Sequence, residues 1–204
     1  MQNLGASIGG IISLALNVER AYRGSISQTT YIVLITIMCL GVPFALALPQ
    51  PSRVQRTDGR EVVITRAPSI SHEFRAFWAL VRNPIVLALM PLMLYSQWFL
   101  SYQWEFNYAY FTVRSRAMNS MLFYLGGLVA SLLLGQLLDW ERYSRPFRAR
   151  VGFFIVTVTV GASWILGQVV QAYYSKTTPT LDFVEREYGL GCIVFLLWGI
   201  SDPL

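Results

Sequence analysis

Charged residues are scarce in this 204-residue chain, at 13% against 54% hydrophobic residues. A soluble domain carries about 25% charged residues, so a water-exposed globule would need roughly twice the charge present here. The mean hydropathy is +0.47. These values argue against a soluble enzyme, a disordered chain and a disulfide-rich secreted module, and they indicate a membrane protein.

Lysine and cysteine are almost as scarce. Lys176 is the only lysine, so fifteen of the 16 basic residues are arginines. These arginines lie in short gaps between apolar runs and not on a folded basic face, which argues against nucleic-acid binding despite the net charge of +5. Cys39 and Cys192 both lie inside apolar runs. We interpret them as small core residues and not as a disulfide or a metal pair.

The residues that common catalytic sites need are missing. His72 is the only histidine, no convincing nucleophile lies beside it, and no cluster of Cys and His suits zinc. The sequence also lacks a GxxxxGK[ST] phosphate-binding loop. We therefore expect a protein that is not an enzyme and that uses no metal or cofactor.

Long apolar runs replace the missing charge. A membrane helix needs about 20 mainly apolar residues, because the hydrocarbon core is about 30 Å thick. Four runs meet this length well, at residues 31–49, 84–102, 118–138 and 151–173. Two shorter runs, at residues 4–17 and 189–204, are near the lower limit. We expect a polytopic, all-α membrane helix bundle with six spans, in which the incomplete end runs indicate a piece of a longer pattern.

The gaps between the runs differ in charge. Six spans would place the second and fourth gaps on one side, with ten basic residues, and the other three gaps on the opposite side, with six. The richer side is predicted to be cytoplasmic, since the positive-inside rule counts lysine and arginine. The cytoplasmic gaps are residues 50–83 and 140–150, and the others are residues 18–30, 103–117 and 174–188.

The long basic gap divides the chain. Residues 1–50 are predicted to hold two spans, residues 51–83 a cytoplasmic basic connector, and residues 84–204 four spans. Within the connector, helical spacing from 71 to 82 puts Phe74, Phe77, Trp78 and Val81 on one face. This pattern is typical of an amphipathic helix at the lipid headgroups, and equally of a helix that leads into the next span.

Small residues at helical spacing predict close helix packing. Gly5 and Gly9 form one such pair, and Gly127, Ser131 and Gly135 form a second series. Small side chains allow helix backbones to approach one another in a bilayer.

Three residues are candidates for substrate binding. Asp202 follows the last apolar run, and if that span continues past it, the acid lies inside the membrane, where burying a charge usually marks function. The alternative is an interface residue beside Pro203. Trp104 and Glu105 lie in an aromatic cluster that would suit an organic or cationic ligand. The alternative for this cluster is an ordinary aromatic belt.

A second group of charges lies at the predicted cytoplasmic ends of two spans. Asp139 ends the run 118–138, and Arg142 and Arg145 follow it. These residues are predicted to form a charge network that locks one conformation of a transporter. The alternative is that Asp139 and Glu141 simply offset nearby arginines.

The order of spans and loops resembles spans five to ten of the major facilitator superfamily. The stretch 135–139, GQLLD, is similar to the start of that superfamily's cytoplasmic loop motif, GxLxD, although Trp140 and Arg142 replace the expected basic residue and glycine. Over nearly the whole chain, segments such as QNLGASIGGIISLALN, SYQWEFNYAY and CIVFLLWGISDPL resemble the fungal branch of the uncoordinated-93 (Unc-93-like) family.

This resemblance implies a twelve-span parent in which Asp202 lies in the tenth span. It implies a multi-pass membrane transporter that moves a small molecule by alternating access, with a secondary metabolite as one substrate class in a fungus. The alternatives are a non-transporting scaffold, a channel or trafficking regulator with a membrane-protein partner, and an inactive truncated fragment. No residue in the sequence selects the substrate.

Overall fold

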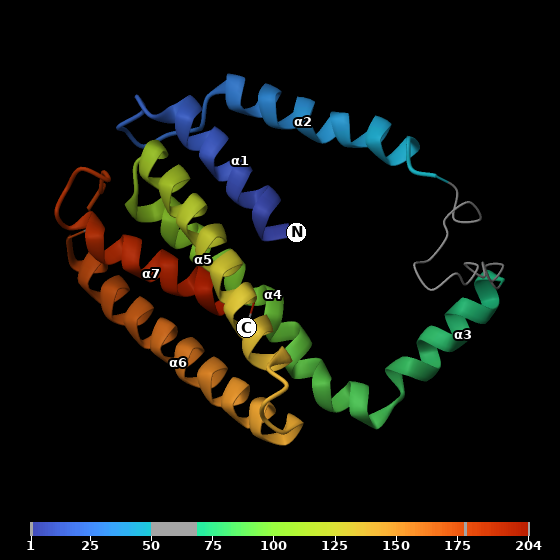
Figure 1. The fold of residues 1–204 in the computed structure, drawn as a ribbon. Coiled ribbons are helices and arrows are strands. Elements are labelled where there is room, and N and C mark those ends of the chain that lie inside the picture. The colour runs from blue at the N-terminus through green and yellow to red at the C-terminus, as the bar shows by residue number, and fades with distance from the viewer. Residues whose placement is uncertain (1, 50–68, 178, 204) are drawn as a thin grey trace. The chain divides into compact units, whose positions relative to one another are not determined.

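A computed structural model describes residues 2–49, 69–177 and 179–203 (Figure 1). The chain divides into two compact units, one formed by Met1–Leu34 with Trp104–Leu204 and the other by Ile35–Gln103. The described residues are almost entirely helical. The helices are α1 (Gln2–Asn17), α2 (Gln28–Leu46), α3 (Ile70–Val81), α4 (Pro84–Tyr110), α5 (Val113–Asp139), α6 (Arg145–Thr177) and α7 (Tyr188–Ser201).

Three of the described helices, α2, α5 and α6, are long and apolar enough to cross a bilayer. Their outward side chains are large and apolar: Met38 and Phe44 on α2 are each 76% exposed, and Phe153 on α6 is 74% exposed. Exposed apolar surface of this extent needs an apolar solvent. The all-helical fold and the membrane location predicted from the composition are therefore confirmed. Helices α1 and α7 are apolar but shorter.

Local sequence explains where two of the long helices begin. Asn83 caps α4, because its side-chain oxygen accepts a hydrogen bond from the Ile85 amide at 3.0 Å, and Pro84 occupies the first helical position, where its missing N–H is no loss. Thr112 caps α5 in the same way and accepts a bond from the Ser115 amide. The break between α4 and α5 is thus only Phe111 and Thr112.

Three helices, α4, α5 and α6, extend beyond the apolar runs that predicted them. α5 and α6 begin five and six residues before the runs at 118–138 and 151–173, and α4 continues through Tyr110. A helix satisfies its own backbone hydrogen bonds, so it continues beyond the hydrocarbon at no penalty. α3 confirms the predicted helix at 71–82 to within one residue. Residues 50–68, most of the predicted connector, lie outside the described residues.

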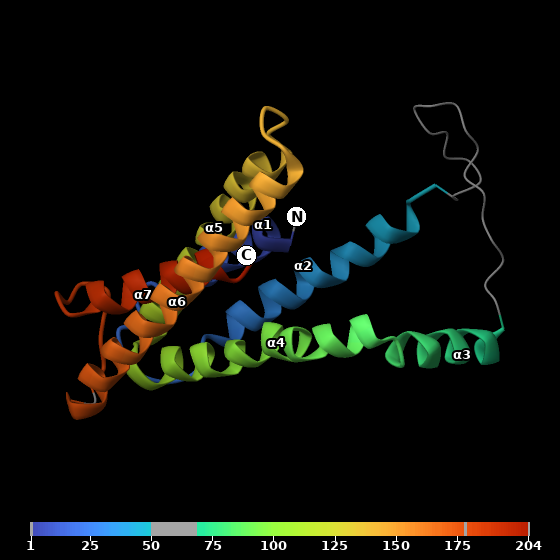
Figure 2. The ribbon, with the colours of Figure 1, turned by 90° about the horizontal axis from the view of Figure 1, so that it is seen from below.

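In the first unit α5 is the central helix. It packs against α1, α6 and α7, and α7 also packs against α6. In both views α7 lies beside α5 and α6 (Figure 1; Figure 2). The core of this unit is aromatic, with Phe195 and Trp198 of α7 fully buried. The ring centroids of Phe106 and Trp198 lie 5.4 Å apart, which joins the end of α4 to α7.

Glycines allow these helices to approach closely, although mostly not the glycines that the spacing predicted. A Cβ at Gly5, Gly9 or Gly135 would meet no described atom within 4 Å, whereas one at Gly127 would lie 3.0 Å from the Gly199 carbonyl oxygen. The unpredicted contacts are tighter. A Cβ at Gly199 would lie 2.0 Å from the Phe123 carbonyl oxygen, and one at Gly10 would lie 2.9 Å from the Met121 Cα. Spacing finds small residues, but it does not say which helix face meets a partner.

Candidate functional site

Three loops meet at the end of the first unit where α5 begins. The Thr112 amide donates a hydrogen bond to the Leu181 carbonyl at 3.0 Å, and the Leu181 amide donates to the Tyr110 carbonyl at 2.7 Å. On the other side, the Val113 amide donates to the Tyr22 carbonyl at 3.0 Å. The α1–α2, α4–α5 and α6–α7 loops therefore lie together. This is the arrangement that alternating spans predict for the gaps at 18–30, 103–117 and 174–188.

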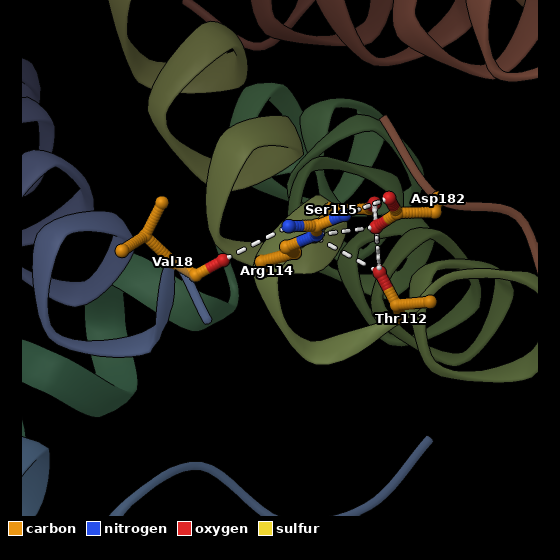
Figure 3. A network of polar contacts seen from close by, with 5 residues as sticks. All are labelled: Val18, Thr112, Arg114, Ser115 and Asp182. Carbon is orange, nitrogen blue, oxygen red and sulfur yellow. Dashed lines mark hydrogen bonds and ion pairs between the residues drawn. The ribbon is translucent and has the colours of Figure 1, made fainter. Parts of the chain in front are cut away.

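An ion pair holds this loop cluster together. The Arg114 guanidinium pairs with the Asp182 carboxylate through two nitrogens, and the Arg114 Nε lies 2.7 Å from Asp182 Oδ1 (Figure 3). Thr112 Oγ1 donates to the same oxygen at 2.8 Å, and Ser115 Oγ lies 3.3 Å from it. A carboxylate with several donors is held in one orientation, which fixes the α6–α7 loop on the start of α5.

The pKa of Asp182 reflects these contacts. Its bonds to Arg114, and then those to Thr112 and Ser115, lower the pKa from 3.8 to about 2 despite the opposing effect of burial. Hydrogen bonds and an adjacent cation both favour the charged form of a carboxyl group. Asp182 therefore carries its negative charge at neutral pH, as its ion pair with Arg114 requires.

Arginines extend the loop cluster to α1 and α2. Arg114 Nη1 donates to the Val18 carbonyl at 3.2 Å (Figure 3), and the Arg116 guanidinium donates to the Gly24 carbonyl. The Arg116 guanidinium also lies 4.9 Å from the centre of the Tyr108 ring. One short stretch of α5 thus binds the α1–α2 loop and the α6–α7 loop at the same time.

Buried amides join α4, α5 and α7 one turn deeper. Asn119 Nδ2 donates to Asn107 Oδ1 at 2.9 Å, and the Tyr188 hydroxyl donates to Asn119 Oδ1 at 2.7 Å. All three residues are buried. Polar residues inside membrane bundles commonly bond to neighbouring helices, and Asn119 does so here. Gln136 and Gln168 are exposed.

Trp104 and Asp202, two of the predicted binding residues, lie in the same part of the bundle. The Trp104 ring centre is 5.5 Å from that of Phe123 and 6.3 Å from that of Tyr124. Asp202 follows α7 and is close enough to Tyr124 to act on it electrostatically. Asp202 is half-buried, and the described residues provide no hydrogen bond or ion pair to its carboxylate. An unpaired acid near an aromatic ring has the chemistry of a cation site.

Glu105 does not lie in this aromatic region. It is exposed on α4, whereas Trp104, its neighbour in the chain, turns its ring toward α5 and α7. Successive residues of a helix point about 100° apart, so the two side chains diverge. A role for Glu105 in binding remains a prediction, at a position outside the aromatic core.

The predicted charge network lies at the opposite end of α5, about 40 Å away along a 27-residue helix. Asp139, Glu141, Arg145 and Arg148 line a hollow of about 470 Å³ there. Arg148 bonds to the Leu138 carbonyl. The described residues contain no ion pair between Asp139 and Arg145, and Arg142 is exposed outside the hollow. The conformational role of these residues remains a prediction.

Curated proteins of similar sequence extend over nearly the whole chain. An UNC93-like protein of Schizosaccharomyces pombe is 31% identical over 99% of this chain, which spans 42% of that protein. The notoamide biosynthesis cluster protein O' of Aspergillus versicolor is 32% identical over 95% of this chain, again 42% of the relative. UNC93-like protein 1 of Arabidopsis thaliana is 27% identical over 99% of the chain and 45% of the relative.

The chain is similar to UNC93-like proteins over nearly its whole length. It spans less than half the length of these relatives. No protein-family model matches the chain, and no solved structure matches it. The resemblance to UNC93-like proteins that the sequence segments carried is thus confirmed, and the long apolar helices indicate a membrane protein.

The loop cluster contains residues that the sequence did not single out. Arg114 was counted only as one of six basic residues in three gaps, and Asp182 lies among other acids in the α6–α7 loop. The sequence did indicate that Arg114 and Asp182 lie on the same side of the membrane. This shared side limits the possible partners of Arg114 to the acids of the same three gaps, but it does not choose among them: Glu19, Glu105, Asp182, Glu185 and Glu187.

Proposed function

We propose that the whole protein moves a small organic cation across the membrane by alternating access. The observation that supports this most is the half-buried Asp202 carboxylate, which lies near Tyr124 and has no partner among the described residues. A charge is costly to hold among apolar helices, so an unpaired one is typical of a binding site. The nearby Trp104 and Phe123 rings would contact the apolar part of such a cation.

The helix packing supports the rocking motion that this mechanism needs. If residues 1–50 end one bundle and residues 84–204 belong to the other, the contact between α1 and α5 is a contact between bundles. The bonds of Arg114 and Arg116 to the α1–α2 loop then close the non-cytoplasmic end. Transporters of this kind work by moving two packed bundles about a central site.

The substrate class follows from the same residues. A carboxylate with aromatic neighbours favours a protonated amine on an organic framework. One relative is named for a notoamide biosynthesis cluster. We therefore extend the proposal to a basic secondary metabolite as the natural cargo.

A flux assay tests this proposal. The whole protein that carries these residues is purified and reconstituted in liposomes, and uptake of radiolabelled methylphenylpyridinium, an aromatic cation, is measured under an inside-negative potential. We expect uptake above that of empty liposomes, and a fall of at least about tenfold in Asp202→Asn, since an ion-paired contact is worth more than about 1.4 kcal/mol in a partly buried site.

Glu185→Gln is the matched control, because Glu185 is an exposed acid in the α6–α7 loop, and its uptake should equal that of the unchanged protein. Glu105→Gln examines the remaining predicted position. Absence of uptake in the unchanged protein, or full uptake in Asp202→Asn, would refute the proposed site and favour a non-transporting scaffold or regulator.

A further inference from the structure

Helix α3 has one continuous apolar face. At 100° per residue, Ile70, Phe74, Phe77 and Val81 fall within a narrow arc, and Trp78 lies at its edge. The side chains of Phe74 and Phe77 are 67% and 59% exposed, and none of the described residues of α3 is buried. An uncovered apolar stripe on a short helix needs a partner surface.

The opposite face is basic. Arg75 and His72 lie there, Arg82 follows the last turn, and Glu73 is the only acid in α3. The Arg82 guanidinium lies 5.1 Å from the centre of the Trp78 ring. Tryptophan and arginine at the border between an apolar and a polar face are typical of helices at the level of lipid headgroups.

The position of α3 in the chain selects the partner. Only Arg82 and Asn83 separate it from α4, which begins with the predicted span at 84–102. α3 therefore starts from the membrane surface. Its 12 residues extend about 18 Å, too short for a hydrocarbon core of about 30 Å, so α3 cannot cross the bilayer itself.

We propose that α3 lies flat in the headgroup region of an anionic lipid leaflet. The stripe of Phe74, Phe77 and Val81 is buried among the upper acyl chains, and Arg75 and Arg82 bind lipid phosphates. The sequence left this open against a helix that simply leads into α4. The exposed stripe and the two-residue break before α4 favour the surface position, and the proposal does not depend on transport.

Spin-label accessibility tests the position of α3 in the full chain reconstituted in nanodiscs. The native cysteines are removed with Cys39→Ala and Cys192→Ala. Single labels are then placed by Phe74→Cys or Phe77→Cys on the apolar face and by His72→Cys or Ala79→Cys on the polar face. Met38→Cys on the exposed apolar side of α2 and Glu185→Cys in a loop calibrate lipid and water.

With about one third phosphatidylserine in phosphatidylcholine, we expect the apolar-face labels to collide with oxygen and to report a depth of about 5 to 10 Å. The polar-face labels should collide with a water-soluble nickel complex. Arg75→Gln with Arg82→Gln, or phosphatidylcholine alone, should move the Phe77 label toward water.

Three outcomes would overturn the proposal. Equal nickel access on both faces would place α3 in water. Protection of the Phe77 label from both oxygen and nickel would show that protein covers the stripe, either a second copy or another part of the chain. A depth that does not respond to phosphatidylserine or to the arginine substitutions would remove the anionic leaflet as the partner.

Discussion

Replacing Gly199 with alanine is expected to prevent the first unit from folding stably. The new Cβ would lie 2.0 Å from the carbonyl oxygen of Phe123 and 2.6 Å from its carbonyl carbon, which are backbone atoms of α5. A flexible side chain can turn away from such a contact, but a helix backbone cannot, so α5 and α7 must separate. Overpacking of a core costs about 1 to 3 kcal/mol, and we expect at least the upper value here.

Gly189→Ala is the matched control, because Gly189 lies in the same helix and a Cβ there would meet no described atom within 4 Å. Alanine favours a helix over glycine by about 0.5 to 1 kcal/mol, so this variant should be as stable as the unchanged protein or slightly more stable. Thermal unfolding in detergent, followed by size-exclusion chromatography, measures both. Equal melting temperatures for the two variants would contradict the close packing of α5 and α7.

Removal of Asp182 is expected to have the second largest effect. Asp182→Ala leaves the Arg114 guanidinium and the hydroxyls of Thr112 and Ser115 without their shared acceptor. Taking one partner from a buried pair costs about 3 to 5 kcal/mol. Arg114 reaches solvent, with a side-chain exposure of 19%, so we expect about 2 to 3 kcal/mol, since water screens the charge that remains.

Asp182→Asn removes the negative charge but keeps the size of the side chain. We expect its effect on stability to depend on pH. The pKa of Asp182 is lowered to about 2, so its charge stabilises the folded protein fully above the unfolded pKa of about 4. That contribution, about 1 to 2 kcal/mol after screening, is lost as the pH falls from about 4 to about 2.

The melting temperature of Asp182→Asn should therefore lie several degrees below that of the unchanged protein at pH 7, and the gap should close near pH 2. Glu185→Gln, an exposed acid three residues away, should show no gap at either pH. A gap for Asp182→Asn that is independent of pH would show that the ion pair does not stabilise the loop cluster.

Apolar length predicted the helices well, because it is a property of each segment alone. The runs at 31–49, 118–138 and 151–173 lie almost wholly within α2, α5 and α6, the three described helices able to span a membrane. The alternation of six spans further predicted that three gaps share one side, and those gaps are hydrogen-bonded to one another. These features depend on burial in lipid and on charge, which composition expresses directly.

Contacts between helices were harder to predict, because they depend on rotation and register. Gly10 and Gly199 make close approaches, whereas Gly5 and Gly135, which fit the same small-residue pattern, meet no described atom within 4 Å. For the candidate site, the sequence indicated Trp104 and Asp202, which the fold brings to one region. It also paired Trp104 with Glu105, and helical geometry turns those two apart. The partner of Arg114 required the loops to be placed in space.

A disulfide across the contact between α1 and α5 tests most directly whether two bundles move against each other there. An ideal Cβ at Gly10 lies 3.2 Å from the Met121 Cβ and 2.9 Å from its Cα, so α1 and α5 must separate by a few tenths of an ångström to reach the Cβ separation of about 3.5 to 4.5 Å in disulfides. Gly10→Cys and Met121→Cys are introduced together with Cys39→Ala and Cys192→Ala, the bond is identified by peptide mapping, and methylphenylpyridinium uptake is measured before and after reduction. We predict that the disulfide forms, that uptake stops while it is intact, and that reduction restores uptake. Failure of the disulfide to form, or unchanged uptake while it is intact, would contradict the account.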